Sequence, residues 1–296
     1  MTHLLGKRIK ELRERIGMSQ RDACKGICTQ AYISKIENGV IYPSAYLLME
    51  LSNRFNTDIS YLLDISNTPS HEYIIEVFTQ IREAIYQRDY SLVRELLNSV
   101  KDNDIFQVPE HKQFLLWHEG ICLYYEDHNF PDAIDYLNKS LSITSSEKKF
   151  LSEREIEILL SKANIYTDKG EYSVALSIYE EAFIQQRSIP NITNKYLPVR
   201  FFYNYARALR LNKDYEQSLE MVDKGIQYAK KNNLLYLQGD LFYQKGANYK
   251  ALNLIEKAIE NFNLAEMAYR IEDNLTSLNL VESMKEELSK NTVKKE

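Results

Sequence analysis

The 296-residue sequence has few of the residues that interrupt helices: only nine glycines and six prolines. It also lacks the alternating apolar and polar runs that indicate strands, so we expect an all-α fold. Its three cysteines, Cys24, Cys28 and Cys122, are too few and too unevenly spaced for a disulfide framework. The scarcity of all three residue types excludes a small disulfide-stapled or β-rich protein.

Long apolar runs are missing as well, and the first residues lack the apolar core of a signal peptide. We therefore expect a cytoplasmic protein that makes no membrane contact. Glycine-rich phosphate loops, serine elbows and zinc-spaced Cys/His sets are also missing, which argues against an enzyme. No catalytic residue, cofactor or metal site is predicted. His111 and His118 lie seven residues apart near Glu119, and we interpret them as structural or surface residues rather than metal ligands.

The net charge of −5 by itself argues against nucleic-acid binding, but the charge is distributed unevenly between two regions of the chain. Residues 1–66 carry nine Lys and Arg against seven Asp and Glu, whereas residues 67–296 carry 28 against 35. Attraction to phosphate depends on local charge rather than on the sum over the chain. Five of the nine cations fall in the first expected helix: Lys7, Arg8, Lys10, Arg13 and Arg15.

The first sixty residues have the pattern of a compact five-helix domain. Apolar residues recur at helical spacing from Leu5 to Ile16, and Gly17 ends this helix. Four further helices each follow a residue suited to cap them, namely Ser19, Thr29, Ser44 and Asp58. We therefore predict an N-terminal domain over residues 1–66.

This stretch resembles the Xre/Cro-type helix-turn-helix repressor domains. The matching residues are Arg13, Met18-Ser19-Gln20, Thr29-Gln30, Ile33-Ser34-Lys35-Ile36-Glu37-Asn38-Gly39 and Pro43-Ser44. In that family the second helix of the motif lies in the major groove of DNA. The resemblance implies that Gln30, Ala31, Ser34 and Lys35 face base edges. It further implies that Gln20, Thr29 and Asn38 touch phosphates and that Arg13 pairs with Glu37 for structural reasons.

The rest of the chain repeats a pattern that resembles tetratricopeptide hairpins. The clearest unit holds Ala163, Tyr166, Gly170, Tyr172, Ala175, Tyr179 and Ala182. The successive anchors Ala133, Ala175, Ser218 and Ala258 lie 42, 43 and 40 residues apart. We expect a linker at 67–72, with Thr68-Pro69 starting a helix. Residues 73–290 should form a right-handed superhelix of about five hairpins, capped by a last helix over 274–289. Residues 291–296 are expected to be a flexible tail.

The first helix of each hairpin should line the concave side of such a stack, and it carries polar and aromatic residues. Counting along these helices places Trp117, Tyr124, Asn164, Arg200, Tyr203, Asn204, Arg207 and Tyr243 there. Arg200, Arg207 and Arg210 share nearly one face, so their like charges should repel unless an anion relieves them. An extended peptide would offer a carboxylate to these arginines and backbone groups to the asparagines. Alternatively, the arginines pair with carboxylates of the adjacent repeat.

Over nearly its full length the chain resembles the PlcR-type peptide-sensing regulators of Gram-positive bacteria. The resemblance is carried by Ile27-Cys28, Val40-Ile41-Tyr42-Pro43-Ser44, Phe114-Leu115-Leu116-Trp117, Ala163-Asn164-Ile165-Tyr166, Tyr203-Asn204-Tyr205-Ala206 and Tyr243-Gln244-Lys245-Gly246. It implies a homodimer that binds a palindromic promoter site in quorum sensing, when a short signalling peptide occupies the concave groove. Arg88 matches a basic residue that helps to hold the peptide in that group.

Two other functions remain open from the sequence. One is a helix-turn-helix regulator that responds to a small metabolite or to oxidation of Cys24 and Cys28. The other is a repeat scaffold that acts through protein–protein contacts. For the peptide-controlled regulator, we hypothesise that peptide binding changes the pitch of the repeats and so sets the spacing of two DNA-binding domains.

Overall fold

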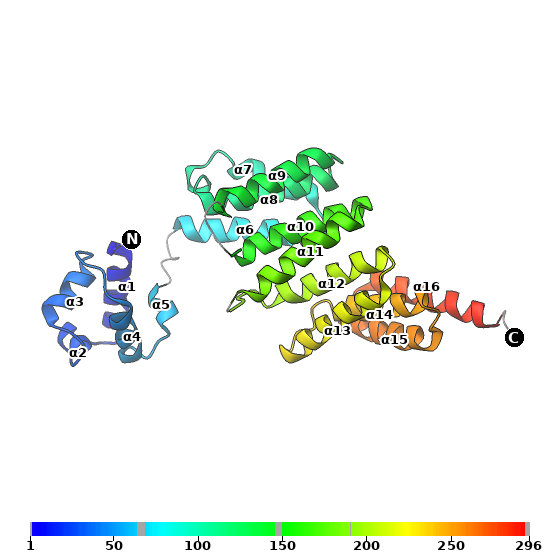
Figure 1. Ribbon diagram of the computed structural model, residues 1–296. Helices are drawn as coiled ribbons and strands as arrows, with labels where there is room; N and C mark the ends of the chain where they lie inside the picture. Colours follow the sequence, from blue (N-terminus) through cyan, green and yellow to red (C-terminus); the bar gives the residue numbers. More distant parts are fainter. Residues whose placement is uncertain (1, 64–68, 146–149, 190, 294–296) are drawn as a thin grey trace. The chain divides into compact units, whose positions relative to one another are not determined.

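A computed structural model describes residues 2–63, 69–145, 150–189 and 191–293, and helices joined by turns make up this part of the chain (Figure 1). The prediction of an all-α fold is confirmed there. None of the helices described is long and apolar enough to cross a membrane. The chain divides into two compact units, residues 1–86 and 87–296.

The first unit begins with five short helices whose caps follow the sequence prediction. They are α1 (Thr2–Arg15), α2 (Gln20–Cys24), α3 (Gln30–Glu37), α4 (Ala45–Arg54) and α5 (Ile59–Leu63). The side chains of Ser19, Thr29 and Ser44 each accept a hydrogen bond from a backbone N–H in the first turn of the helix that follows. Each cap satisfies one N–H that would otherwise lack a partner, which is worth about 1 kcal/mol. The caps therefore fix where the helices begin.

The core of this five-helix domain depends on a close approach between α1 and α3. Ile9, Ile33 and Leu51 are fully buried together, and such side chains each stabilise the fold by roughly 1.5–3 kcal/mol. Gly6 lies against the backbone of α3, where a Cβ atom would collide with the carbonyl oxygen of Ile36. Glycine is thus required at this position for α3 to dock. The sixth helix of the unit, α6 (Pro69–Gln87), follows residues 64–68.

The second unit is a series of helical hairpins. Its helices are α7 (Tyr90–Val100), the 3₁₀ turn η1 (Asp104–Phe106), α8 (Pro109–Tyr125), α9 (Phe130–Ser145), α10 (Glu153–Lys169), α11 (Tyr172–Arg187), α12 (Tyr196–Leu211), α13 (Tyr215–Lys231), α14 (Gln238–Ala251), α15 (Ile255–Ile271) and α16 (Leu275–Val293). The pairs α8–α9, α10–α11, α12–α13 and α14–α15 pack most extensively, and α16 packs on α15. The helices α8, α10, α12 and α14 are here called the first helices. In this series α8 contacts α10, α10 contacts α12, and α12 contacts α14.

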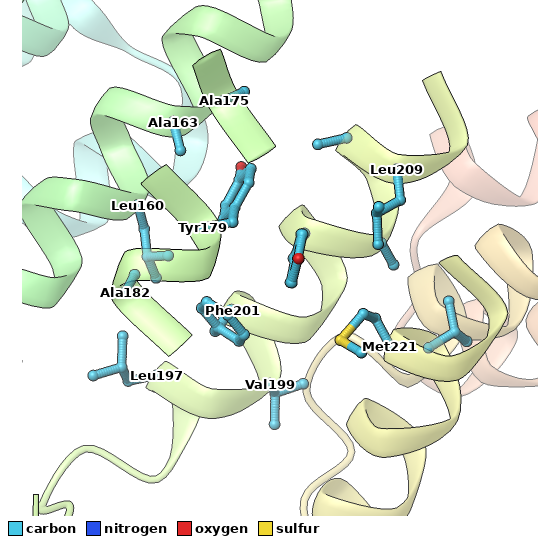
Figure 2. Packing of buried hydrophobic residues seen from close by; sticks show 14 of the residues in the cluster. Leu160, Ala163, Ala175, Tyr179, Ala182, Leu197, Val199, Phe201, Leu209 and Met221 are labelled. Carbon is cyan, nitrogen blue, oxygen red and sulfur yellow. The ribbon is translucent and has the colours of Figure 1, made fainter. Parts of the chain in front are cut away.

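Small residues let the two helices of a hairpin approach, and tyrosine and phenylalanine fill the space beside them (Figure 2). Ala163 of α10 and Ala175 of α11 are fully buried, as is Tyr179 one turn further along α11. In the hairpin of α14 and α15, a Cβ atom on Gly246 would lie 2.7 Å from the ring of Phe262. The spacing of small and aromatic residues that predicted the hairpins is therefore the spacing that packs them.

One turn position recurs along the chain with a left-handed backbone. The φ angle is 59° at Arg88, 55° at His128, 85° at Gly170, 70° at Lys213 and 60° at Asn253. The intervals between these residues are 40, 42, 43 and 40 positions, so the turn at Arg88 follows the same geometric period as the four turns after it. This periodicity supports five repeats and identifies Arg88 as the turn residue of the first.

The helix ends differ slightly from the expected boundaries. Residues 69–72, expected in the linker, form the first turn of α6, whereas residues 67 and 68 lie outside the described part. The last expected helix, 274–289, corresponds to α16, which continues to Val293. Residues 291–293 of the expected tail are thus helical, and residues 294–296 lie outside the described part.

Candidate nucleic-acid interface and ligand surface

Helix α3 presents one apolar face to the core and one polar face to the solvent. Ile33 and Ile36 are fully buried, which leaves Gln30, Ala31 and Lys35 exposed and Ser34 half-buried. Glutamine can pair with both major-groove atoms of adenine, and lysine can reach guanine or phosphate. The four residues predicted to face bases therefore share the solvent side of one helix.

The three residues predicted to touch phosphates flank this helix. Thr29 caps α3, because its Oγ1 accepts the N–H of Tyr32 at 3.2 Å, and Asn38 is the exposed residue at the other end. Gln20 is half-buried, and its side-chain nitrogen donates to Oε2 of Glu37 at 2.9 Å. Gln20 thus helps to position Glu37.

The expected structural pairing of Arg13 with Glu37 is present. Nε and NH2 of Arg13 donate to the two oxygens of Glu37 at 2.6 and 2.9 Å, and NH1 donates to the backbone oxygen of Met18 at 2.8 Å. The Glu37 side chain is 1% exposed. This two-pronged pair ties α1 to α3.

The positive charge of α1 is less available for DNA than its sequence suggested. Arg13 is neutralised in the core, and the guanidinium groups of Arg8 and Arg15 lie 4.6 and 5.8 Å from the ring centre of Tyr61 on α5. Lys7 lies 3.6 Å from Glu11. The exposed cation of α3 itself is Lys35.

In the second unit, the residues predicted to face a ligand lie on consecutive first helices. They differ in exposure and in whether they already have hydrogen-bond partners within the protein. Trp117 of α8 is 4% exposed and donates from Nε1 to the hydroxyl of Ser161 on α10 at 2.9 Å. Asn164 accepts the hydroxyl of Tyr179 at 2.5 Å. Tyr124 is half-buried against the rings of Tyr125 and Phe130. Trp117 and Asn164 thus also hold helices together, a role that the sequence did not indicate.

Two arginines of the α12 stripe pair inside the protein, so the expected repulsion is relieved for them. Arg200 forms an ion pair with the buried Glu157 of α10. NH2 of Arg207 lies 2.6 Å from Oδ1 of Asp168, at the end of α10. Both partners belong to the preceding repeat, which is the alternative pairing that the sequence left open.

Asp168 connects three consecutive first helices. Besides the bond from Arg207 of α12, it accepts the hydroxyl of Tyr125 of α8 at 2.6 Å. Burial works against the charge of Arg207, but the neighbouring Asp168 outweighs this effect and raises the pKa of Arg207. The carboxylate thereby joins α8, α10 and α12 through polar contacts.

Arg210 differs from the other two arginines. Its Nε donates to Oε1 of Gln244 on α14 at 2.6 Å, and no carboxylate pairs with it among the described residues. Burial lowers the pKa of Arg210, and the charge of Arg207 lowers it further, although Tyr243 and Tyr203 act in the opposite direction. Arg210 is therefore a partly desolvated cation without a counter-ion in this part of the chain.

Asp240, in the first turn of α14, is a partly desolvated acid in the same region. Burial raises its pKa, whereas the hydroxyl of Tyr269, which donates to Oδ1 at 3.2 Å, and the charge of Arg88 lower it. Burial also raises the pKa of Tyr203 on α12, and the charge of Arg88 acts in the opposite direction. The side chain of Arg88, in the turn of the first repeat, is thus close enough to act electrostatically on residues of the fourth and fifth repeats. Asp240 follows Arg88 by 152 positions in the sequence.

Three further predicted residues lie on the first helices α12 and α14. Tyr203, Asn204 and Tyr243 are half-buried, and the ring of Tyr243 packs 5.7 Å from that of Phe262. A ring nitrogen of His111 and one of His118 lie 2.7 and 2.8 Å from backbone oxygens. Among the described residues there is no group of three or more side chains placed to hold a metal ion.

Comparison with known proteins identifies the two units. Residues 9–62 match a helix-turn-helix family model, and residues 74–288 match the model described as the RNPP family C-terminal domain. The chain belongs to the RNPP family. No curated protein sequence matches it significantly.

Solved structures of similar proteins extend this assignment to the whole RNPP chain. Bacillus thuringiensis PlcR, crystallised in complex with the peptide PapR7 and DNA, is 26% identical; the match has a TM-score of 0.78 and covers 97% of this chain and 99% of PlcR. ComR from S. thermophilus, in complex with DNA and its signalling peptide ComS, is 18% identical, with a TM-score of 0.62 and coverage of 96% and 99%. Streptococcus dysgalactiae Rgg2, described as an SHP pheromone receptor, is 14% identical, with a TM-score of 0.67 and the same coverage. The recognition of a PlcR-type chain is thereby confirmed, and ComR and Rgg2 support the shared fold.

Several residues of this RNPP surface were missed by sequence reasoning. Asp240 lies one turn before Tyr243 on α14, so extending the count along that helix would have found it. Gln244 was noted only as part of a matching segment. Asp168 and Tyr125 gave no comparable signal, because their roles depend on how successive repeats rotate.

Proposed function

We propose that this chain is a homodimeric transcription regulator that reads a palindromic DNA site through α3 and is controlled by a short signalling peptide bound on its first helices. The observation that carries the proposal is one chain joining an exposed polar recognition helix to a repeat surface whose partly desolvated Arg210 and Asp240 form no ion pair among the described residues. Its membership of the RNPP family supports the same conclusion. The regulator is a quorum-sensing protein in this proposal.

In the DNA-bound state, Gln30, Ala31, Ser34 and Lys35 face base edges in the major groove. Thr29, Asn38 and the free side of Gln20 contact phosphates at the two ends of α3. The N-terminus of a helix favours phosphate oxygens, because its backbone N–H groups point toward them. Bacillus thuringiensis PlcR, the 26% identical relative, was crystallised with DNA.

The peptide lies along the first helices in this proposal. Arg88, Tyr124, Arg207 and Tyr243 provide charged and aromatic contacts, and Asn204 offers its amide to the peptide backbone. Trp117, Asn164, Arg200 and Tyr203 contribute to the same surface, although Trp117, Asn164 and Arg200 already have partners within the protein. An extended peptide suits a surface that continues across several repeats.

A second copy of the chain has an apolar face on which to pack. Leu264, Met267 and Ile271 recur at helical spacing on α15 and are 38%, 62% and 70% exposed. Leu275 and Leu280 of α16 are also exposed, at 70% and 45%. Exposed apolar side chains in one region are typical of a protein interface, and a twofold dimer matches a palindromic DNA site.

A regulator of this kind works in the cytoplasm, where both DNA and a re-imported peptide are accessible to it. The three cysteines are free thiols, which suits a reducing compartment.

The direct test is selection of DNA by the full-length protein from a pool of random 30-base-pair duplexes. The selection is run with and without the concentrated peptide fraction of the host's culture medium. We expect palindromic sequences to be enriched, and we expect the peptide fraction to change affinity for them at constant salt concentration. A matched variant, Gln30→Ala with Lys35→Ala, should lose the enrichment. Equal DNA affinity with and without the peptide fraction would defeat peptide control, and no enrichment at all would defeat sequence-specific binding.

A further inference from the structure

Of the three arginines of α12, one has no counter-ion within the described part of the chain. Glu157 and Asp168 of the preceding repeat pair with Arg200 and Arg207. Arg210, one turn beyond Arg207, has Gln244 as its hydrogen-bonding partner and no carboxylate among the described residues. Asp240 does not fill this role, because no ion pair or hydrogen bond joins it to Arg210 among the described residues, and its side-chain hydrogen bond comes from Tyr269.

Gln244 binds only the inner nitrogen of the Arg210 guanidinium and leaves its two terminal nitrogens available to a ligand. The glutamine is 2% exposed, and its oxygen holds Nε at 2.6 Å. The two terminal nitrogens, NH1 and NH2, have no polar partner among the described residues. These nitrogens form a planar fork that matches the two oxygens of a carboxylate. A buried amide that fixes the inner nitrogen lowers the entropy lost when the outer fork binds.

The surroundings of Arg210 strengthen its attraction for an anion. The guanidinium is partly desolvated, which lowers its pKa, and Tyr243 and Tyr203 are close enough to act on that pKa in the opposite direction. An ion pair in such a place is stronger than one on an open surface, because less water screens it. Arg207 adds a second positive charge nearby, so an anion at Arg210 would also relieve the repulsion between the two arginines.

We propose that the fork of Arg210, fixed by Gln244, is the position at which the signalling ligand is held by a carboxylate. This inference rests on the proposed function and specifies the chemistry of the ligand. The carboxylate is either the C-terminus of the peptide or an Asp or Glu side chain within it. Both sources present the same two oxygens to the guanidinium.

The experiment uses a synthetic pool of randomised heptapeptides and the full-length protein. The pool is made twice, once with C-terminal acids and once with C-terminal amides, and bound peptides are identified by mass spectrometry. The best peptides are resynthesised with each carboxylate removed in turn, as the amide or through Asp→Asn and Glu→Gln exchange. Their affinities are measured for the wild type, for Arg210→Gln and Arg210→Lys, and for the control Lys231→Gln, which removes an exposed cation at the end of α13.

The wild type should bind the peptide with the critical carboxylate at least about tenfold more tightly than the same peptide without it, as expected for a hydrogen-bonded charge. Arg210→Gln should bind both forms alike, and Lys231→Gln should behave as the wild type. A fall in affinity when the C-terminal acid is replaced by the amide identifies the C-terminus, and a fall upon Asp or Glu exchange identifies a side chain. Arg210→Lys keeps the charge but lacks the fork, so its preference should fall between those of the wild type and Arg210→Gln.

Two results overturn the inference in different ways. If Arg210→Gln keeps the wild-type preference, or if the wild type shows none, the carboxylate position is wrong while peptide binding stands. If the wild type retains no peptide from either pool, the proposed function fails and the inference fails with it. Circular dichroism checks folding of each variant, and Arg210→Lys decides the question if Arg210→Gln does not fold.

Discussion

The two units of this chain treat a partly buried arginine in opposite ways. In the five-helix domain, Arg13 is enclosed by both oxygens of Glu37 and by the backbone of Met18. In the repeats, Arg210 has one amide partner, and its two terminal nitrogens have no polar partner in the part of the chain that the structure describes. The first arrangement gives the arginine all the partners it needs to fix two helices, whereas the second leaves binding capacity for another molecule. The difference teaches that burial of a charge indicates a ligand site only when its internal partners are incomplete.

The comparison is tested most severely at Glu37. Glu37→Gln leaves Arg13 charged and without its counter-ion, which should destabilise the five-helix domain by about 3–5 kcal/mol. Hydrogen exchange of segments within residues 2–63, measured against urea concentration, reports this loss. The matched control is Glu14→Gln, because Glu14 is also within 3.4 Å of Arg13 but its side chain is 54% exposed. The control should change stability by less than about 1 kcal/mol, and a similarly small effect of Glu37→Gln would contradict a closed, structural pair.

A second prediction concerns the polar face of α3. Gln30→Ala should reduce discrimination at one base pair in each half-site by about 1–3 kcal/mol while leaving the fold intact. Selection from random duplexes, followed by affinity measurement on single-base variants, gives the discrimination. Gln80→Ala, which changes an exposed glutamine of α6, is the control and should keep the wild-type preference. Unchanged discrimination in Gln30→Ala would remove Gln30 from the reading face.

The partly desolvated Asp240 of the repeats predicts a smaller, pH-dependent effect. Burial raises the pKa of Asp240 in the folded protein, so the folded state binds this proton more tightly than the unfolded state. Asp240 should therefore lower stability as the pH rises above the ordinary aspartate pKa of about 3.9 and through its raised value. Asp240→Asn should make urea unfolding less dependent on pH between 4 and 7, relative to the wild type. Asp102→Asn, an exposed substitution, should leave the pH dependence as it is; the same behaviour in Asp240→Asn would count against a desolvated acid.

The smallest effect is expected at the cysteines. Burial raises the pKa of the Cys122 thiol to about 12, so about one thiol in ten thousand is a thiolate at pH 8. Cys28 of the five-helix domain is half-buried and should react sooner with a thiol reagent in the native protein. Mass spectrometry of the labelled sites over time separates the two. Fast labelling of Cys122, or a change in DNA affinity on its oxidation, would favour redox control of the repeats.

Local features of the fold could be predicted from the sequence because they depend on neighbours along the chain. Ser19, Thr29 and Ser44 cap the helices that they were expected to cap, and Gly17 and Gly170 adopt the left-handed turns that favour glycine. The small residues that pack the hairpins were predicted from their period. These features follow from spacing within about one helical hairpin.

Contacts between repeats could not be predicted in the same way. Asp168 lies 39 residues before Arg207, and the rotation between their repeats decides whether they meet. Arg200 and Arg207 therefore follow the alternative that the sequence left open, pairing with carboxylates of the adjacent repeat, whereas Arg210 has no carboxylate partner among the described residues. The DNA-facing and peptide-facing residues remain predictions until they are measured.

The carboxylate of Asp168 is a single hydrogen-bonding group shared by three successive repeats. Because Tyr125 and Arg207 bond to the same side chain, a displacement of either residue changes the polar contacts that connect α8, α10 and α12. A ligand that draws Arg207 away from Asp168 would break the bond to α12 while the bond from Tyr125 of α8 remains. The contact of α12 with α10 can therefore change separately from the contact of α8 with α10.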